Sequence, residues 1–582
     1  MVNPKSKDPI LTIKSDVLFR LARSLSLSSR GKFGIHIKNM ADLSFYELTG
    51  QSAYVWLHIN GRRTIEEIIQ KSRKAGRIKD SRFKTRATQF LKSLIEIGLV
   101  QTQGRCSKEA NPDNLKYFLS LLKKRESQKG PRNPRKLIPR PYAEPGDRRL
   151  FLNVRRRFLK NLKGKVSIRL KREWSQYKGQ VHDFSAHVTT VSDTERLVSR
   201  GRGFNTNAEA AACAAVGEAL EGLCLNGVHI DYLSKSYNEL ITSGHRALDP
   251  KTYKFFHSNQ KIFKNNEVSH PTRASRIQWT YFEDQVSSTK RILIPSEING
   301  QFSRGKERAY FGDVTSSGCA FATDKETAKL KAALELVERD GALFYWRTQN
   351  KPIQIDLTTL PKRINALLDI PGESKKNIKL YFLKSELSFV TIQSVFFGNP
   401  ALNEPRFVSN YATCINPVEA AEKSLLELLY VCGSFKRGVS QNLYGIDFDQ
   451  SVWDFSDRTD LYFYQPAQEA YKFLTARNSS AISLDKIPNL DRGSARKNLE
   501  FLSEEFKKNS LRLFFADNTL PTLKKAGFWA YRAFSPDLIS LEGVHRHRRL
   551  GYSRYYTLPK LLRLKRRPTR PSQLNVWPHP LP

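Results

Sequence analysis

Two glutamates three residues apart, Glu335 and Glu338, stand in a stretch rich in alanine, leucine and lysine at residues 323–340. This composition has strong helix propensity, and residues three apart lie on one face of a helix. The same spacing recurs at Glu218 and Glu221, in a stretch of almost entirely small and apolar residues. Buried carboxylates need partners or metal ions, and two facing pairs would form an oxygen-rich cage suited to Mg²⁺. The pairs therefore predict a metal-nucleotide site between repeated helices.

The elements that must position these glutamates carry helix start signals. We expect capping boxes at Thr206 with Glu209 and at Thr323 with Glu326, each beginning twelve residues before the first glutamate of its pair. A single Glu-x-x-Glu is usually a solvated helix surface, but a repeated one at a fixed distance from its cap is not expected by chance. The repetition is the reason to treat the pairs as a site.

A third, weaker copy begins at Asn416, has Pro417 at the first helical position and reaches Glu427 eleven residues after the cap. Small-residue turns at 199–203 and 316–320 are predicted to precede the first two helices. Such turns let a helix N-terminus approach a phosphate closely, which again indicates a nucleotide.

The chain resembles the YcaO-domain family in its most specific stretches, which are Gly201-Arg202-Gly203, Glu218-Ala219-Leu220-Glu221, Glu335-Leu336-Val337-Glu338-Arg339-Asp340, and the late segments 517–519, 535–538 and 547–551. The resemblance is dispersed over about residues 165–582. It implies that ATP and Mg²⁺ are bound between two acidic helix pairs and used to activate a peptide backbone amide.

The resemblance also implies roles for single residues. The metal ligands would be Glu218, Glu221, Glu335 and Glu338. The nucleotide contacts would be Arg202, Gly203, Ser317, Arg339, Lys423 and Glu427, with Arg339 also offsetting charge during catalysis. The chain departs from the family pattern at Gly222, Lys423 and Tyr430, where the family usually carries arginine, arginine and glutamine. A lysine can replace an arginine as a cation, although not as a bidentate fork.

The chain ends in Pro578-His579-Pro580-Leu581-Pro582, and alternating prolines impose a stiff extended conformation. A disordered end is the usual fate of a terminus. The Pro-x-Pro-x-Pro ending, however, resembles the azoline-forming subset of the YcaO family, in which the tail enters the active site. The resemblance implies that the terminal carboxylate of Pro582 acts as a general base.

The first hundred residues predict a small separate domain of winged-helix type, with strands at 33–38 and 99–102, helices through 45–59 and 83–95, and a capping box at Thr64 with Glu67. Residues 48–68 resemble PqqD-like domains, which bind the leader of a precursor peptide as an added strand. The alternative is DNA binding, for which Lys84, Arg86 and Lys92 would supply phosphate contacts.

We therefore expect an α+β chain with a leader-recognition domain at 1–105, a basic Pro-rich linker at 106–165 and a YcaO ATP-binding domain at 166–582. From Val166 onward, strand-like runs alternate with the repeated helices, which predicts antiparallel sheet beneath them.

The composition limits the compartment and the partners. The net charge is +41, which implies attraction to polyanions such as an acidic peptide or nucleic acid. No apolar run reaches the length of a membrane span, no secretory signal begins the chain, and the six cysteines show no Cys-x-x-Cys. We expect a cytoplasmic protein without membrane contact, for which nucleic acid is the less favoured partner.

These observations predict an ATP- and Mg²⁺-dependent cyclodehydratase that forms thiazolines or oxazolines from Cys, Ser or Thr of a ribosomally made precursor peptide. The expected partners are that peptide, a flavin dehydrogenase and other cyclodehydratase subunits, and a homodimer is compatible with the sequence. Three alternatives stay open: a thioamide- or amidine-forming enzyme, a non-catalytic docking scaffold in which Gly222 marks lost ATP binding, and a DNA-binding regulator.

Overall fold

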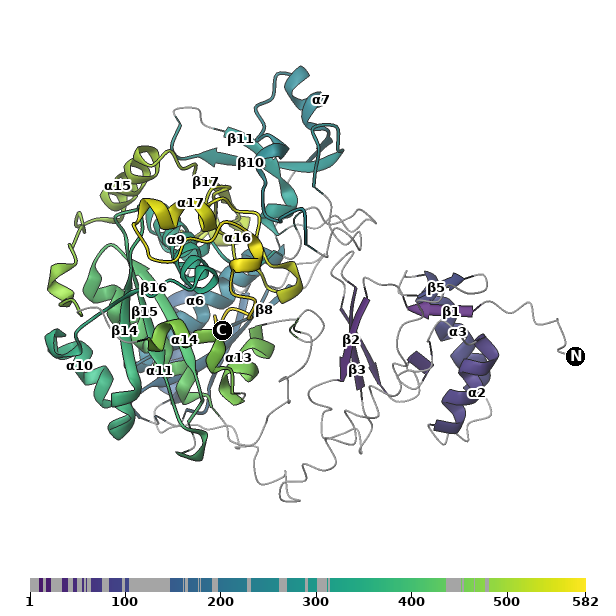
Figure 1. Cartoon of the computed structure of the whole chain (residues 1–582), viewed down its shortest axis with the longest axis horizontal. Helices are drawn as coiled ribbons and strands as arrows, with labels where there is room; N and C mark the ends of the chain where they lie inside the picture. The colour runs from purple at the N-terminus through teal and green to yellow at the C-terminus, as the bar shows by residue number, and fades with distance from the viewer. Residues whose placement is uncertain are drawn as a thin grey trace, which may run out of the picture. The chain divides into compact units, whose positions relative to one another are not determined.

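The computed structural model of this chain divides into two compact units (Figure 1). The first comprises residues 1–137, 261–269 and 305–310, and the second comprises 138–260, 270–304 and 311–582. The structure describes residues 10–13, 17–21, 34–39, 45–49, 55–56, 59, 64–75, 83–96, 100–103, 147–160, 162, 166–175, 177, 179–190, 197–227, 232–260, 270–287, 291–300, 311, 314–402, 404–435, 448, 452, 455–464, 466–476 and 481–581.

The first unit contains β1 (Ile10–Ile13), β2 (Val17–Leu21), β3 (Gly34–Asn39), β4 (Phe45–Thr49), α2 (Ile65–Ala75), α3 (Phe83–Glu96) and β5 (Val100–Gln103). Strand β1 pairs with β5, and β2, β3 and β4 form a second antiparallel sheet. The helix expected through 45–59 is wrong at its start, because residues 45–49 pair with β3 along their whole length. Their aromatic content suits a strand.

The capping box at the start of α2 is confirmed. The backbone N–H of Thr64 donates to Glu67 Oε2 at 2.9 Å, and the N–H of Glu67 donates to Thr64 Oγ1 at 3.3 Å. Both donors belong to the first turn, where no helical carbonyl can serve them.

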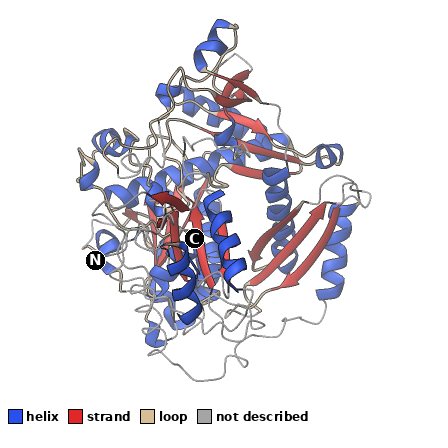
Figure 2. Cartoon of the chain, turned by 90° about the vertical axis from the view of Figure 1, so that its right-hand side faces the viewer, coloured by secondary structure: helices blue, strands red, loops and turns tan. Residues whose placement is uncertain are grey.

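The second unit is built on three antiparallel sheets (Figure 2). The first sheet has the spatial order β6 (Val166–Arg172), β7 (His182–Thr190) and β8 (Val198–Asn205). The second has the order β11 (Arg291–Pro295), β10 (Ile277–Asp284), β17 (Phe514–Asp517), β18 (Trp529–Phe534) and β12 (Cys319–Ala322), with β9 (Leu233–Lys235) beside β10. The third has the order β13 (Ile353–Gln354), β14 (Ile378–Leu383), β15 (Val390–Phe396) and β16 (Val408–Cys414). The expected α+β class with antiparallel sheet is confirmed for this unit.

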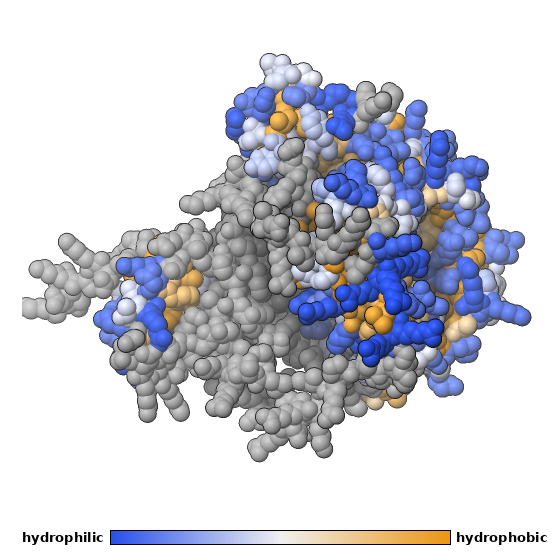
Figure 3. All heavy atoms as spheres, turned by 180° about the vertical axis from the view of Figure 1, so that it is seen from behind, coloured by the Kyte–Doolittle hydropathy of each residue, from blue (hydrophilic) through white to orange (hydrophobic). Residues whose placement is uncertain are grey.

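The helices of the second unit are α5 (Asp147–Leu159), α6 (Ala208–Gly227), α7 (Tyr237–Thr242), α9 (Lys325–Thr348), α10 (Lys362–Asp369), α11 (Pro417–Gly433), α13 (Phe455–Tyr464), α14 (Gln468–Thr475), α15 (Ala495–Lys508), α16 (Pro521–Lys525) and α17 (Arg554–Leu561). Helix α5 lies within the segment 106–165 for which a linker was predicted. Across the described segments, every helix is too short or too polar to cross a membrane. Figure 3 shows hydrophilic side chains over much of the described surface, in keeping with the high net charge.

The three helices of the sequence repeat each follow a strand: α6 follows β8, α9 follows β12 and α11 follows β16. Their start signals are partly corrected. The first two helices begin one residue later than expected, because Asn207 Oδ1 accepts from the N–H of Ala210 and Asp324 Oδ1 accepts from the N–H of Thr327. Asn and Asp are stronger caps than the preceding threonines. The cap of α11 is Asn416, as predicted.

The expected turn at 199–203 is wrong, since these residues lie inside strand β8. The glycines serve close packing instead. A Cβ on Gly201 would lie 2.3 Å from the backbone nitrogen of Ala219, and one on Gly203 would lie 2.2 Å from the carbonyl oxygen of Ala211. Strand β8 thus touches the backbone of α6, which is possible only because the helix presents alanines and the strand presents glycines.

Candidate active site

The glutamate pair of α6 and the glutamate pair of α9 lie close enough for Glu335 to act on the carboxyl of Glu221. The carboxylate of Glu221 lies in the field of both Glu335 and Glu218. Burial raises the pKa of Glu221 well above its ordinary value, and repulsion from these two neighbours adds to the rise. Burial is also the largest cause of the raised pKa values of Glu335 and Glu218. The pairs therefore concentrate negative charge that the protein alone does not neutralise.

Arg339 lies between the two glutamates of α9. Its Nη2 is 3.4 Å from Glu335 Oε1 and 3.9 Å from Glu338 Oε1. Its Nε is buried and has no hydrogen-bond partner within the described part of the chain. The other oxygen of Glu338 accepts from the backbone N–H of Thr413 at 2.9 Å, which ties α9 to strand β16. The Nε–H of Arg339 is thus available to donate a hydrogen bond to a ligand.

Helix α11 adds Lys423 and Glu427 to the cluster. The Nζ of Lys423 is 4.0 Å from Glu338 Oε2, and its side chain is 55% exposed, so it can also reach a ligand. Burial raises the pKa of Glu427 to about 7, while the charges of Lys423 and Arg339 and a hydrogen bond from Asn410 oppose the rise. The third, weaker copy of the repeat therefore brings one cation and one carboxyl to the glutamate pairs.

Strand β8 supplies Arg202 from the other side. Its backbone N–H donates to Glu218 Oε2 at 2.9 Å, and its guanidinium donates to Asp183 and lies 5.1 Å above the ring of Tyr430. That ring stacks on Phe204 with centroids 4.3 Å apart. The ring of Tyr430 therefore packs against the guanidinium of Arg202. Tyr430 is the residue that stands where the family usually carries glutamine.

Ser317 lies in a turn, but the turn expected at 316–320 is only partly correct, because Cys319 and Ala320 already belong to strand β12, which precedes α9. Gly318 has a φ of +80°, and a Cβ there would lie 2.7 Å from a side-chain carbon of Leu336. Leu336 stands between the two glutamates of α9, so Ser317 is within a residue of that contact. Its hydroxyl accepts a hydrogen bond from Thr315 Oγ1 at 3.0 Å. Gly203, in contrast, meets the site only through its backbone contact with α6.

The donor set fits Mg²⁺ held jointly with phosphate. Within the described residues, no three carboxylate, imidazole or thiol groups converge closely enough to hold an ion unaided. Mg²⁺ usually keeps waters and is bound by one or two carboxylates plus phosphate oxygens. Four glutamates beside Arg339, Lys423 and Arg202 provide both halves of such a site, carboxylates for the ion and cations for the phosphates.

The C-terminal tail is packed into the second unit, and Pro582 itself lies outside the described residues. The carbonyl of Trp577 accepts from Trp346 Nε1 at 3.1 Å and from Arg347 Nη1 at 2.9 Å. His579 is fully buried and lies in the field of Arg339, which contributes to a pKa well below the ordinary value caused mainly by burial. The tail is therefore fixed on the later turns of α9, the helix that carries Glu335 and Glu338.

Sequence reasoning missed Asp183, Asn410 and Thr413 as parts of this site. Their contacts depend on strand neighbours, and no local pattern marks them. Asp183, for example, reaches Arg202 because β7 pairs with β8. Gly222 packs against strand β8: a Cβ there would lie 2.3 Å from Ser199 Oγ, so a larger residue would require the serine side chain to turn away.

Comparisons with known proteins identify the family and the fold. A sequence model of the family described as YcaO cyclodehydratase, ATP- and Mg²⁺-binding, matches residues 201–539. The fold resembles a heterocyclase in complex with substrate and cofactor, with TM-score 0.56 and 17% identity over 74% of this chain. This chain spans only 57% of the length of that structure.

Two more distant structures are also similar. They are YcaO from Methanopyrus kandleri bound with AMPPCP and Mg²⁺ (TM-score 0.47, 14% identity, 68% of this chain and 91% of that one) and the E. coli microcin synthetase McbBCD complex (TM-score 0.46, 14% identity, 71% and 96%). No curated protein sequence matches the chain.

Proposed function

The chain belongs to the YcaO cyclodehydratase family, and from that premise we propose that it is a cyclodehydratase that forms azolines in a ribosomally made precursor peptide. ATP and Mg²⁺ are the cofactors of this family. The substrate residues would be Cys, Ser or Thr, and the products thiazolines or oxazolines.

One observation carries the proposal: Glu335 of the second pair acts on the buried carboxyl of Glu221 in the first, the pKa values of both are raised, and Arg339 lies beside Glu335 and Glu338. A binding scaffold would gain nothing from retaining this repulsion, since replacing the carboxylates by amides would stabilise it. A site that receives a divalent cation and a triphosphate needs the surplus negative charge for the first and the spare donors for the second.

Each residue then has a role in binding or positioning. Glu218, Glu221, Glu335 and Glu338 would hold Mg²⁺, and Arg202, Ser317, Arg339, Lys423 and Glu427 would contact the nucleotide, with Gly203 letting β8 lie close to α6. When bound, ATP supplies the phosphoryl group that activates the amide oxygen of the peptide. Arg339 and Lys423 would stabilise negative charge there.

The tail is proposed to supply the base. The side chain of a Cys, Ser or Thr adds to the preceding carbonyl carbon and loses its proton, which the terminal carboxylate of Pro582 would accept. The contacts of the tail with Trp346, Arg347 and Glu542 support this role, because they hold Trp577 and His579 inside the second unit.

The first unit is proposed to bind the leader of the precursor, which raises the local concentration of the segment to be modified. A flavin dehydrogenase that oxidises the azolines, and other cyclodehydratase subunits, are proposed partners.

The test is mass spectrometry of the precursor peptide encoded beside this gene after incubation with the chain, ATP, Mg²⁺ and any partner subunit encoded there. We expect the loss of one water for each ring. A matched reaction with Glu335→Gln should leave the mass unchanged. Sulfur incorporation with a sulfide donor would show thioamide formation instead, and an unchanged mass with nucleotide bound would reject the cyclodehydratase.

A further inference from the structure

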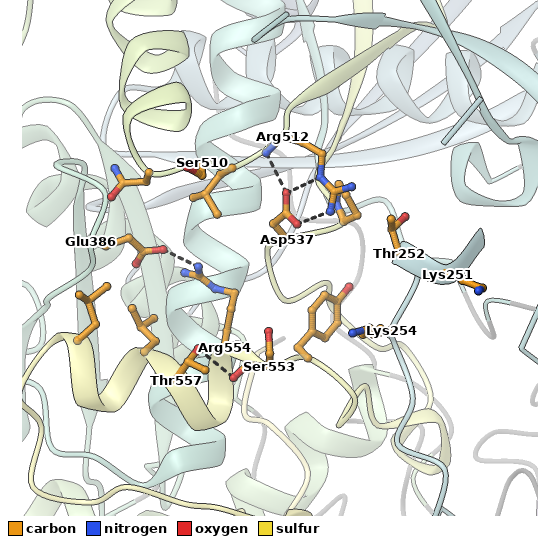
Figure 4. A pocket seen from close by; sticks show the side chains of 16 residues that line it. Lys251, Thr252, Lys254, Glu386, Ser510, Arg512, Asp537, Ser553, Arg554 and Thr557 are labelled. Carbon is orange, nitrogen blue, oxygen red and sulfur yellow. Dashed lines mark hydrogen bonds and ion pairs between the residues drawn. The ribbon is translucent and has the colours of Figure 1, made fainter. Parts of the chain in front are cut away.

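A polar cavity of about 520 Å³ opens in the second unit (Figure 4). It is lined by the segment that carries Lys251 and Lys254, by residues 509–512, which follow α15, and by α17. Its lining shares no residue with the acidic site described above. A cavity of this size can hold a small molecule or a few residues of a peptide.

Two arginines that line this cavity, Arg512 and Arg554, form ion pairs with carboxylates. Arg554 donates from Nε to Asp340 at 2.8 Å and from Nη1 to Glu386 at 2.5 Å. Arg512 donates from Nε to Asp537 at 2.9 Å, and Figure 4 shows this pair facing the same opening. Both guanidinium groups are thus already engaged by carboxylates and are not free to grip a multiply charged anion.

The charge of the cavity is nearly balanced and leaves one positive charge. Four cations line it, and three carboxylates oppose them, counting Asp340 behind Arg554. The surplus lies with Lys251 and Lys254, which are exposed; the charge of Lys251 also acts on Asp249, which is paired with Arg273. A single carboxylate matches this excess, whereas a phosphate dianion does not.

The wall beside α17 is apolar. Leu511, Leu558 and Leu561 line it, and the side chain of Leu561 is 66% exposed at the surface. Together these three leucines give an apolar group of a ligand a surface to pack against. The hydroxyls of Ser553 and Thr557 stand nearby on the same helical segment and can pair with backbone amides.

We infer that this cavity binds a short peptide segment in which one carboxylate side chain stands next to a bulky apolar one. The lysines would receive the carboxylate, the leucines the apolar side chain and the hydroxyls the backbone. For the function proposed above, on which this step rests, the segment would belong to the precursor peptide and lie apart from the residue being modified.

The test is fluorescence anisotropy of a labelled Gly-Leu-Glu-Leu-Gly peptide with the full chain in the absence of ATP. We expect the acidic peptide to bind about tenfold more tightly than its Gln counterpart, as for a hydrogen-bonded charge. The double variant Lys251→Glu/Lys254→Glu should abolish that preference, and Leu561→Asp should weaken both peptides. Lys472→Glu, a charge reversal at a side chain that is 75% exposed outside the cavity, is the control and should change nothing.

Equal binding of the two peptides, or a preference that survives the lysine reversal, would overturn the inference. Free 4-methylpentanoate as a competitor equal to the peptide would overturn the peptide assignment in favour of a small acid. Because binding is measured without ATP, loss of ring formation in a separate assay contradicts the proposed function and leaves this inference standing.

Discussion

Helix α9 carries two groups of charged side chains that differ in how closely they are paired with opposite charges. Near its middle, Glu335 has a raised pKa and shares Arg339 with a second glutamate. Further along, Arg554 donates two hydrogen bonds to Asp340, at 2.8 and 2.6 Å, and Arg347 is paired with Glu542 where neither side chain is exposed. One helix therefore carries glutamates that its arginine contacts only at 3.4 Å or more and charges that are held in close ion pairs.

The difference between these two groups of α9 indicates which charged side chains bind a ligand and which stabilise the fold. A buried charge that only supports the fold is matched, because an unpaired one costs several kcal/mol. The unmatched glutamates are tolerated where a cation is expected to arrive. Asp340 ends the Glu-Leu-Val-Glu-Arg-Asp stretch, yet it belongs to the matched group and faces Arg554 rather than the glutamate pairs.

The largest effect is expected when the close ion pair between Asp340 and Arg554 is removed. Arg554→Met leaves Asp340 and Glu386 buried without their cation, and we expect it to lower the free energy of unfolding by about 3–5 kcal/mol. Arg512→Met is the matched control, since its pair is partly exposed and should cost about 1 kcal/mol or less. Urea unfolding of the three proteins measures both, and equal losses would contradict the distinction.

The second prediction concerns the glutamates near the middle of α9. Glu335→Gln removes a proposed metal ligand, and we expect peptide-dependent phosphate release to fall by about 100-fold or more. The thermal midpoint without nucleotide should stay the same or rise, because repulsion with Glu221 is relieved. A parallel loss of stability and activity would show that this glutamate supports the fold instead.

Ligand addition should sharpen the comparison. Mg²⁺ with a non-hydrolysable ATP analogue at about 100 times its Kd should stabilise the native chain by about 2.7 kcal/mol. Chelation of Mg²⁺ by EDTA should remove most of this gain. The double variant Glu335→Gln/Glu338→Gln should show none of it, whereas Lys472→Glu should show all of it. Stabilisation of the double variant would place the nucleotide elsewhere.

The smallest effect concerns pH and the tail. His579 is buried with a pKa well below its ordinary value, chiefly through burial and then through the charge of Arg458. The unfolded chain therefore binds the extra proton below about pH 6.5, so stability is lost as pH falls through that range and is unaffected above it.

We expect this single histidine to cost up to about 1.4 kcal/mol for each pH unit below 6.5. Urea unfolding at pH 7.5 and 5.5 should show a larger loss for the native chain than for His579→Gln. The difference between the two proteins isolates this histidine from the acidic cluster, whose raised carboxyl pKa values act in the opposite direction. An identical pH dependence would contradict the buried neutral state.

Much of the candidate site was predictable because its parts are local. The spacing of Glu335 and Glu338 fixes them on one face of a helix wherever that helix lies. The cap at Asn416 is likewise set by neighbours along the chain. The turn expected at Gly201 is wrong, because this glycine packs against the backbone of α6 at Ala219, eighteen residues later, and does not form a turn.

The sequence by itself determined the repeated helices, the faces on which their acidic residues lie and the family to which they point, since these follow from contacts a few residues apart. Only the tertiary structure decided which charges are matched. Asp340 and Arg554 are 214 residues apart in sequence, and Arg202 reaches Asp183 only through the register of two strands. Ion-pair energies depend on distance and burial, and both are set by the path of the folded chain.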